Sequence, residues 1–184
     1  MMNYPSNISN SNTLARLPPN NQELEKAILG AILIEKDAVN DAVSFLRSEH
    51  FYNPAHREIY QAIFDLASES LPIDMLTVTD KLRRVGKLEM VGGPSYIMKL
   101  TSLVNSAANI GFHGRVIIEH YIKRKLINIA YTINKNAFED SIDSFELVDE
   151  SAQKIMVLSR ETANKQAVQI NEVADKVLVN IEAV

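Results

Sequence analysis

The sequence has 184 residues, of which 46% are hydrophobic and 23% are charged, as expected for a soluble globular protein with a buried core. The formal net charge of -4 argues against a protein that grips nucleic acid with its whole surface. The chain has no cysteine, which excludes disulfides and thiolate metal sites and agrees with a reducing cytoplasm, where we expect the protein. Its first residues show no secretory signal, and no apolar run of about 18 residues predicts a membrane span.

The N-terminal part of the sequence consists of a tail followed by helical patterns. Residues 1–17 are rich in Asn and Ser and should be disordered, and Pro18 and Pro19 end this tail. Three helical patterns then cover residues 21–35, 37–46 and about 54–68. The first pattern is apolar around most of its circumference, which is typical of a helix in the middle of a bundle.

The next segment predicts two shorter helices separated by glycines. Asp74 or Thr77 can cap the first of them, and Gly86 ends it. A Gly-Gly-Pro run beginning at Gly92 forms a tight turn that opens the second. Together with the three preceding patterns, these helices predict a compact head over residues 18–106.

Residues 107–164 predict an antiparallel helical hairpin that would serve oligomerisation. A long helical pattern to about residue 137 is followed by a short polar turn and a second helix. The first helix carries an apolar stripe and the second a matching one: Ile118, Ile122, Leu126, Ile129, Ala130, Ile133 and Ala137, and Phe145, Val148, Ala152, Ile155, Met156 and Ser159. Within these stripes we expect Ile122, Ile129 and Ile133 to pack against Val148, Ile155 and Met156. Residues 165–184 predict a hinge and an amphipathic linker helix. With no convincing strand, the fold class is all-α.

The long helix has more apolar surface than the hairpin seam can cover. Ile117, Tyr121, Ile127 and Tyr131 lie on its other faces, and exposed apolar patches of this kind usually mark interfaces. Because most contacts between identical subunits are two-fold and self-complementary, the expected partner is the same hairpin of a second copy.

A cluster of titratable side chains, His50, His56 and Glu58, lies beside Tyr52 and Tyr60 and is the best candidate for an active site. A zinc site on one helix needs two histidines four residues apart, whereas these are six apart. An Asn-Pro pair just before His56 starts a helix, so that Glu58 should point away from His50. We therefore interpret the cluster as fold-building, with His56 either hydrogen-bonded locally or packed against the preceding loop. An enzyme using this region is the weakest hypothesis.

Other catalytic signatures are absent from the sequence. It contains no GxxxxGK phosphate loop followed by Ser or Thr, no GxGxxG after a strand, no GxSxG and no HExxH. No catalytic, cofactor-binding or metal-binding residue is therefore predicted. Two basic runs, within residues 81–87 and 123–125, lack the interleaved aromatic residues that stack on bases and are typical of solvated helix faces.

Five segments carry a family resemblance in their order and spacing: LPPNNQELEKAILGAILIE, FYNPAHREIYQAIFDL, LPIDMLTVTDKL, GKLEMVGGPSYIMKL and NSAANI. Over about residues 17 to 184 the chain resembles the N-terminal domain, with helical hairpin and linker helix, of the DnaB family of bacterial replicative DNA helicases. Gly111 and Gly114 depart from the pattern, since larger residues there would favour the long helix.

The resemblance implies an assembly and partner-binding role. Head and hairpin would pair with a neighbour and form the collar of a hexameric ring that receives primase, with a helicase loader as a further candidate partner. The linker helix resembles the one that docks on the adjacent subunit's motor, which points to Val173, Val177, Leu178 and Ile181. The motor, which binds ATP, Mg and most of the DNA, would follow Val184, so we expect this chain to be a fragment that is inactive alone.

A free-standing helical adaptor or regulator of the replication machinery is the alternative function. Neither function involves a membrane. A phosphate-loop motif encoded downstream of Val184 would decide for the helicase.

Overall fold

The computed structural model describes residues 16–102 and 109–161, and all regular structure in these two stretches is helical. This confirms the all-α prediction. The elements are α1 (Gln22–Ile34), α2 (Lys36–Phe45), the short 3-10 helix η1 (Ser48–His50), α3 (Pro54–Ser68), α4 (Met75–Arg84), α5 (Gly93–Ser102) and α6 (Ile110–Ala137). Residues 144–161 form a further helix. The predicted linker helix and nearly all of the predicted tail lie outside the described residues.

Local sequence signals start two of the helices as predicted. The side chain of Asn53 accepts a hydrogen bond from the backbone N–H of Ala55 (2.9 Å), and Pro54 occupies the first position of α3. At the start of α4, Asp74 accepts from the backbone N–H of Thr77, whose hydroxyl accepts from the backbone N–H of Asp74. The hydrogen bond from the Thr77 backbone is the main reason why the pKa of the Asp74 carboxyl is lowered.

Helices α3 and α4 end in the same hydrogen-bonded motif with different residues at its left-handed position. After α3, the N–H of Ser70 donates to Ala67 O and the N–H of Leu71 donates to Leu66 O, while Ser70 has a φ of 54°. After α4, Gly86 takes the equivalent position at a φ of 72°. Because this conformation disfavours side chains other than that of glycine, Ser70 is strained where Gly86 is not.

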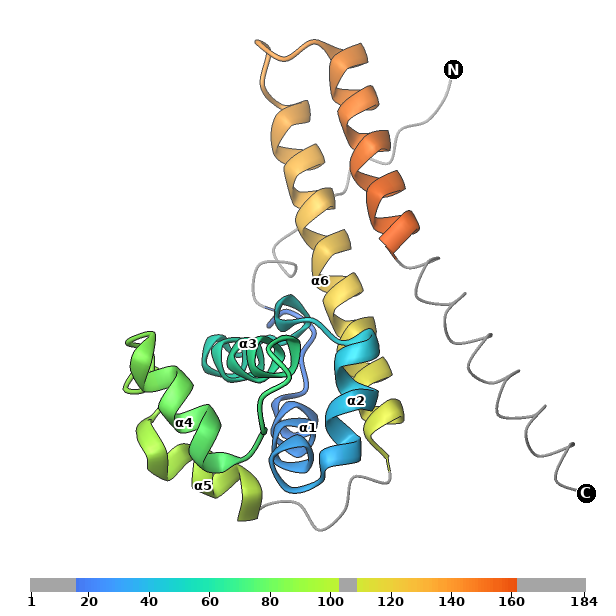
Figure 1. Ribbon diagram of the computed structural model, residues 1–184. Coiled ribbons are helices and arrows are strands. Elements are labelled where there is room, and N and C mark those ends of the chain that lie inside the picture. Colours follow the sequence, from blue (N-terminus) through green and yellow to red (C-terminus); the bar gives the residue numbers. More distant parts are fainter. Residues whose placement is uncertain (1–15, 103–108, 162–184) are drawn as a thin grey trace, which may run out of the picture.

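Helix α1 lies in the middle of the head, as its apolar pattern predicts. It contacts α2, α3, α5 and α6 (Figure 1). Ile28, Leu29 and Ile32 on α1 are wholly buried, together with Ile59 and Ile63 of α3. A single apolar core therefore joins all parts of the head.

Helix α6 belongs to the head at one end and to the hairpin at the other. Its first turns are packed into the head, with Ile110 and Ile117 in the same core. Gly114 makes this approach feasible, because a Cβ atom there would lie 2.3 Å from Cε2 and 2.7 Å from Cζ of Phe45 on α2. The close packing at Gly114 thus offsets its low helix propensity. The head core includes Ile110 and Ile117 and so extends beyond the boundary predicted at residue 106.

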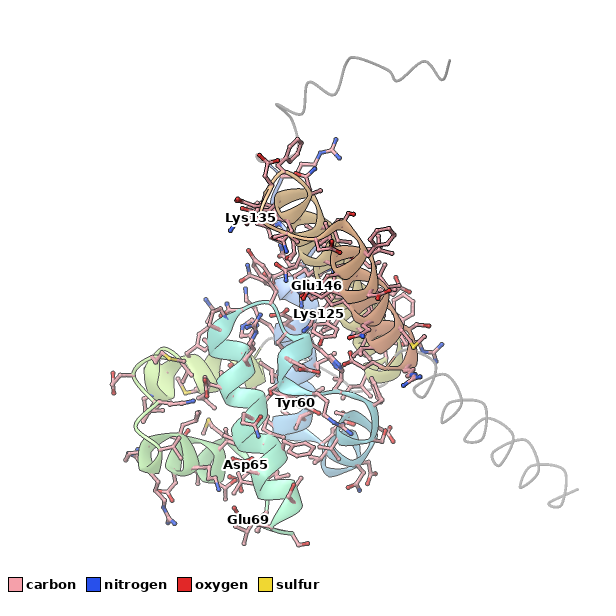
Figure 2. All side chains as sticks on the ribbon, turned by 90° about the horizontal axis from the view of Figure 1, so that it is seen from above. Tyr60, Asp65, Glu69, Lys125, Lys135 and Glu146 are labelled. Carbon is pink, nitrogen blue, oxygen red and sulfur yellow. The ribbon has the colours of Figure 1, made fainter. Side chains whose placement is uncertain are left out.

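The rest of α6 projects from the head and runs beside the helix of residues 144–161, which returns antiparallel to it (Figure 1). Figure 2 shows this projection from above, with Lys125 and Lys135 on α6 and Glu146 on the second helix. The predicted hairpin is therefore present.

The predicted hairpin seam is right only in part for α6 and wrong for the second helix. Ile122, Ile129 and Ile133 of α6 are half-buried, as expected, whereas Leu126, Ala130 and Ala137 of the same stripe are exposed. In the helix of residues 144–161, however, the least exposed positions are Leu147, Ser151, Lys154 and Leu158. The stripe expected in the seam points to solvent instead: Phe145, Val148, Ala152, Ile155, Met156 and Ser159 are all exposed.

Candidate functional site

His56 is the centre of a buried hydrogen-bond network that ties three helices together. Its Nδ1 lies 2.6 Å from Oε2 of Glu25 on α1, and its Nε2 lies 2.7 Å from the hydroxyl of Tyr96 on α5. The Glu25 carboxylate also accepts from the backbone N–H groups of Tyr52 and Asn53 (2.5 and 3.2 Å), and both His56 and Glu25 are almost fully buried. The expected local hydrogen bond of His56 is therefore wrong, because its partners come from distant parts of the sequence.

The other members of the cluster face different neighbours. Nδ1 of His50 accepts from the backbone N–H of Arg47 at 3.0 Å, and Glu58 forms an ion pair with Lys87. His50 and His56 thus serve different contacts, and no group of three or more potential metal ligands occurs within the described stretches. All three side chains thus have partners within the head.

Arg124 fixes the base of the hairpin to the head. Its Nη1 donates to Pro19 O (2.8 Å) and its Nη2 to His50 O (2.7 Å). The guanidinium also lies over the rings of Tyr52 and Tyr121, 5.5 and 6.0 Å from their centroids. Burial lowers the pKa of Arg124 and raises that of Tyr121. The interpretation of residues 123–125 as a solvated face is therefore wrong for Arg124.

The other basic run, on and after α4, meets acidic neighbours at the surface. Lys81 pairs with Glu69 at 2.8 Å, and Arg84 pairs with Asp80 at 2.7 Å. The pair of Arg84 and Asp80 is largely exposed and contributes little to stability, while Lys81 is partly covered and Glu69 is exposed. This agrees with a solvated helix face.

The four residues expected to form the oligomer interface separate into two pairs. Ile117 and Tyr121 are only 2% and 6% exposed, because the base of α6 is packed against the head. The expectation that they form free surface is wrong. Ile127 and Tyr131, one helical turn apart on the projecting part of α6, are 54% and 61% exposed.

The projecting hairpin carries most of the large apolar side chains that are strongly exposed on the described helices. Ile127 and Tyr131 are exposed on α6, and Phe138 is exposed in the turn that follows it. The second helix adds the exposed stripe described above. Nothing within the described chain covers these side chains, so the hairpin surface is the candidate functional site.

The four residues expected to dock the linker helix, Val173, Val177, Leu178 and Ile181, lie outside the described residues. Among the described helices, none is long and apolar enough to cross a membrane.

Comparison with known proteins shows one family throughout. The family model described as "DnaB-like helicase N terminal domain" matches residues 17–119, more than half of the chain. The replicative DNA helicase DnaB of Rhodothermus marinus is 40% identical over 169 residues, which cover 92% of this chain and 18% of that protein. The chain therefore spans about a fifth of that relative's length.

Solved structures agree in fold. The crystal structure of the N-terminal domain of DnaB helicase from Mycobacterium tuberculosis matches with a TM-score of 0.73 and 34% identity, covering 76% of this chain and 99% of that one. A DnaB-like replicative helicase, described with its interactions with primase, matches with a TM-score of 0.61 and 28% identity, over 77% of this chain and 31% of that one.

Proposed function

Because the chain belongs to the family of DnaB-like helicase N-terminal domains, we propose that it is the assembly and partner-binding part of a hexameric, ATP-dependent helicase that unwinds DNA at the replication fork. In this function the chain has no turnover of its own. A motor domain would supply the ATP and Mg chemistry and most of the contact with DNA, in line with the missing phosphate loop.

The observation that carries this proposal is the uncovered apolar surface of the hairpin. Ile127 and Tyr131 are held away from the head by a helix that is fixed at its base through Arg124. Exposure of apolar side chains on such a projection to water is unfavourable in free energy unless another protein covers them. We assign this surface of α6 to contact with a second copy of the chain.

Primase is the proposed heterologous partner, since a related helicase was described with its interactions with primase. A helicase loader is a further candidate. The linker residues Val173, Val177, Leu178 and Ile181 are assigned to docking on the motor of an adjacent subunit.

Titration of the chain with primase from the same organism, followed by calorimetry, tests the partner-binding function. We expect saturable binding with a fixed stoichiometry. A folded chain, verified by circular dichroism, that shows no binding at high micromolar primase would contradict the proposed partner-binding function.

A further inference from the structure

Residues 16–20, which we call the strap, precede α1 and pass the base of α6, where the hairpin leaves the head (Figure 1). The carbonyl of Pro19 accepts a hydrogen bond from Nη1 of Arg124 at 2.8 Å. The side chain of Asn20 donates to Pro18 O at 2.8 Å and stabilises the local course of the backbone. Residues 16–18 are exposed, Leu17 by 82%, so the strap contributes little to the apolar core.

The strap leads directly into the central helix of the head. Asn21, the next residue, caps α1 by accepting from the backbone N–H of Leu24 at 3.2 Å. Gln22 then accepts from the side chain of Asn53 at the start of α3, at 3.1 Å. The two adjacent prolines restrict the strap further, because each ring fixes φ near −65° and the first residue of such a pair is held extended. The position of the Pro19 carbonyl is therefore set by the head.

Arg124 is the point at which the strap has most leverage on the hairpin. Apolar packing of α6 against the head ends at Tyr121, since no residue of α6 beyond it is buried. Arg124, about one turn further along, donates to two separate parts of the head, the strap and the carbonyl of His50 on η1. Because Arg124 is only half-buried, water can take the place of Pro19 O when the strap moves away.

We propose that the strap sets the angle between the hairpin and the head, and that its release lets the hairpin swing while the head stays folded. Release removes one of the two hydrogen bonds of Arg124 and leaves the buried core of the head in place. Any process that takes up the strap then changes how the hairpin is presented to a partner. Because the angle is a property of a single chain, this inference does not rest on the proposed function.

Spin labels on introduced cysteines test the proposal, because the wild-type chain has no cysteine. Ser95→Cys on α5 and Asn134→Cys on α6 place one label on the head and one on the hairpin, both at exposed positions. Asn134 lies about 15 Å beyond Arg124 along the helix axis, so a swing of about 20° moves its label by about 5 Å. Double electron–electron resonance resolves such a change. A large excess of unlabelled chain ensures that the distances are those within one chain.

Two truncated chains form the matched comparison. A chain without residues 1–15 keeps the strap, whereas a chain without residues 1–20 loses it but retains Asn21 as the cap of α1. We expect the distance distribution between head and hairpin to stay unchanged in the first chain and to broaden or shift by about 5 Å in the second. If the second chain does not fold, Pro18→Gly with Pro19→Gly replaces it, and the more flexible strap should broaden the same distribution.

A second pair of labels, Asp41→Cys on α2 and Ser95→Cys on α5, is the control within the head, because these helices contact α1 from opposite sides (Figure 1). Its distance should be the same in both truncated chains. Broadening of this pair without residues 1–20 would overturn the proposal, since the head itself would then be loosened. The same head-to-hairpin distribution with and without the strap would also overturn it, because Arg124 would then hold the hairpin through His50 alone.

Discussion

Arg124 of α6 and His50 of η1 are joined by a hydrogen bond from Nη2 to a backbone carbonyl, 2.7 Å long, across 74 positions of sequence. With the second bond to Pro19 O, the planar guanidinium fixes the direction in which α6 leaves the head. The orientation of the hairpin relative to the head is therefore fixed by the two hydrogen bonds of Arg124 in addition to apolar packing.

Arg124→Ala should destabilise the chain by about 2 to 4 kcal/mol, because two charged hydrogen bonds and the contacts with tyrosine rings are lost. Arg124→Lys should restore only part of this, since an ammonium group cannot donate in the same forked geometry. Urea unfolding measures the effect. Lys123→Ala, at the exposed neighbouring position, is the control and should stay within about 0.5 kcal/mol of wild type. Equal unfolding midpoints for Arg124→Ala and Lys123→Ala would show that the contacts of Arg124 do not contribute to the free energy of unfolding.

Two glycines of α6 should respond to alanine in opposite ways. A Cβ atom at Gly111 meets no atom within 4 Å, so Gly111→Ala should stabilise the helix by about 0.5 kcal/mol. Gly114→Ala should instead destabilise by about 1 to 3 kcal/mol, because its Cβ atom would overlap the ring of Phe45. Thermal unfolding of both variants checks the pair. Stabilisation by both substitutions would disprove the close contact between α2 and α6.

The buried network around His56 predicts a larger loss than a local hydrogen bond would. His56→Ala leaves the Glu25 carboxylate buried without one of its partners, which should cost about 3 to 5 kcal/mol. Tyr96→Phe removes only one hydrogen bond and should cost about 1 kcal/mol. Denaturant titrations of wild type, His56→Ala, Glu25→Leu and the variant that combines both substitutions form a double-mutant cycle. We expect strong coupling, and additive losses would contradict the network.

Ser70 offers a stabilising substitution. Ser70→Gly should raise the free energy of unfolding by about 0.5 to 1 kcal/mol, because glycine adopts the observed positive φ without strain. Gly86→Ser, at the equivalent position after α4, should lower it by a similar amount and serves as the reciprocal control. Chemical denaturation resolves such differences. A less stable Ser70→Gly variant would mean that the Ser70 side chain makes a favourable contact that outweighs the strain.

The sequence predicts features that depend on neighbouring residues. The Asn53-Pro54 start of α3, the Asp74 cap of α4 and the Gly86 stop all act within a few residues, and all occur as expected. Contacts over long separations could not be predicted in this way. The partners of His56 are 31 and 40 positions away, and nothing in the local pattern distinguishes them from other acidic or aromatic residues.

The orientation of the second hairpin helix illustrates a different limit. Its sequence contains two stripes at coiled-coil spacing, one mixed and one apolar, and periodicity cannot tell which of them faces α6. For the hairpin alone, burial of the more apolar stripe would be favourable, but the mixed stripe faces α6 instead. Helix spacing also does not reveal how far α6 enters the head, so the pattern places Ile117 and Tyr121 on the surface although both are buried.

The central claim is that the exposed face of α6 brings copies of this chain together, and sedimentation velocity with light scattering tests it most directly. We predict that the wild-type chain is at least a dimer and that Ile127→Glu with Tyr131→Glu lowers its mass while circular dichroism stays unchanged, because charges cannot be buried in an apolar contact. The control is Asn128→Glu with Lys135→Gln, which makes the same change in net charge at exposed polar positions of α6 and should keep the wild-type mass. A monomeric wild-type chain at high concentration, or an Ile127→Glu, Tyr131→Glu variant with the wild-type mass, would contradict the account.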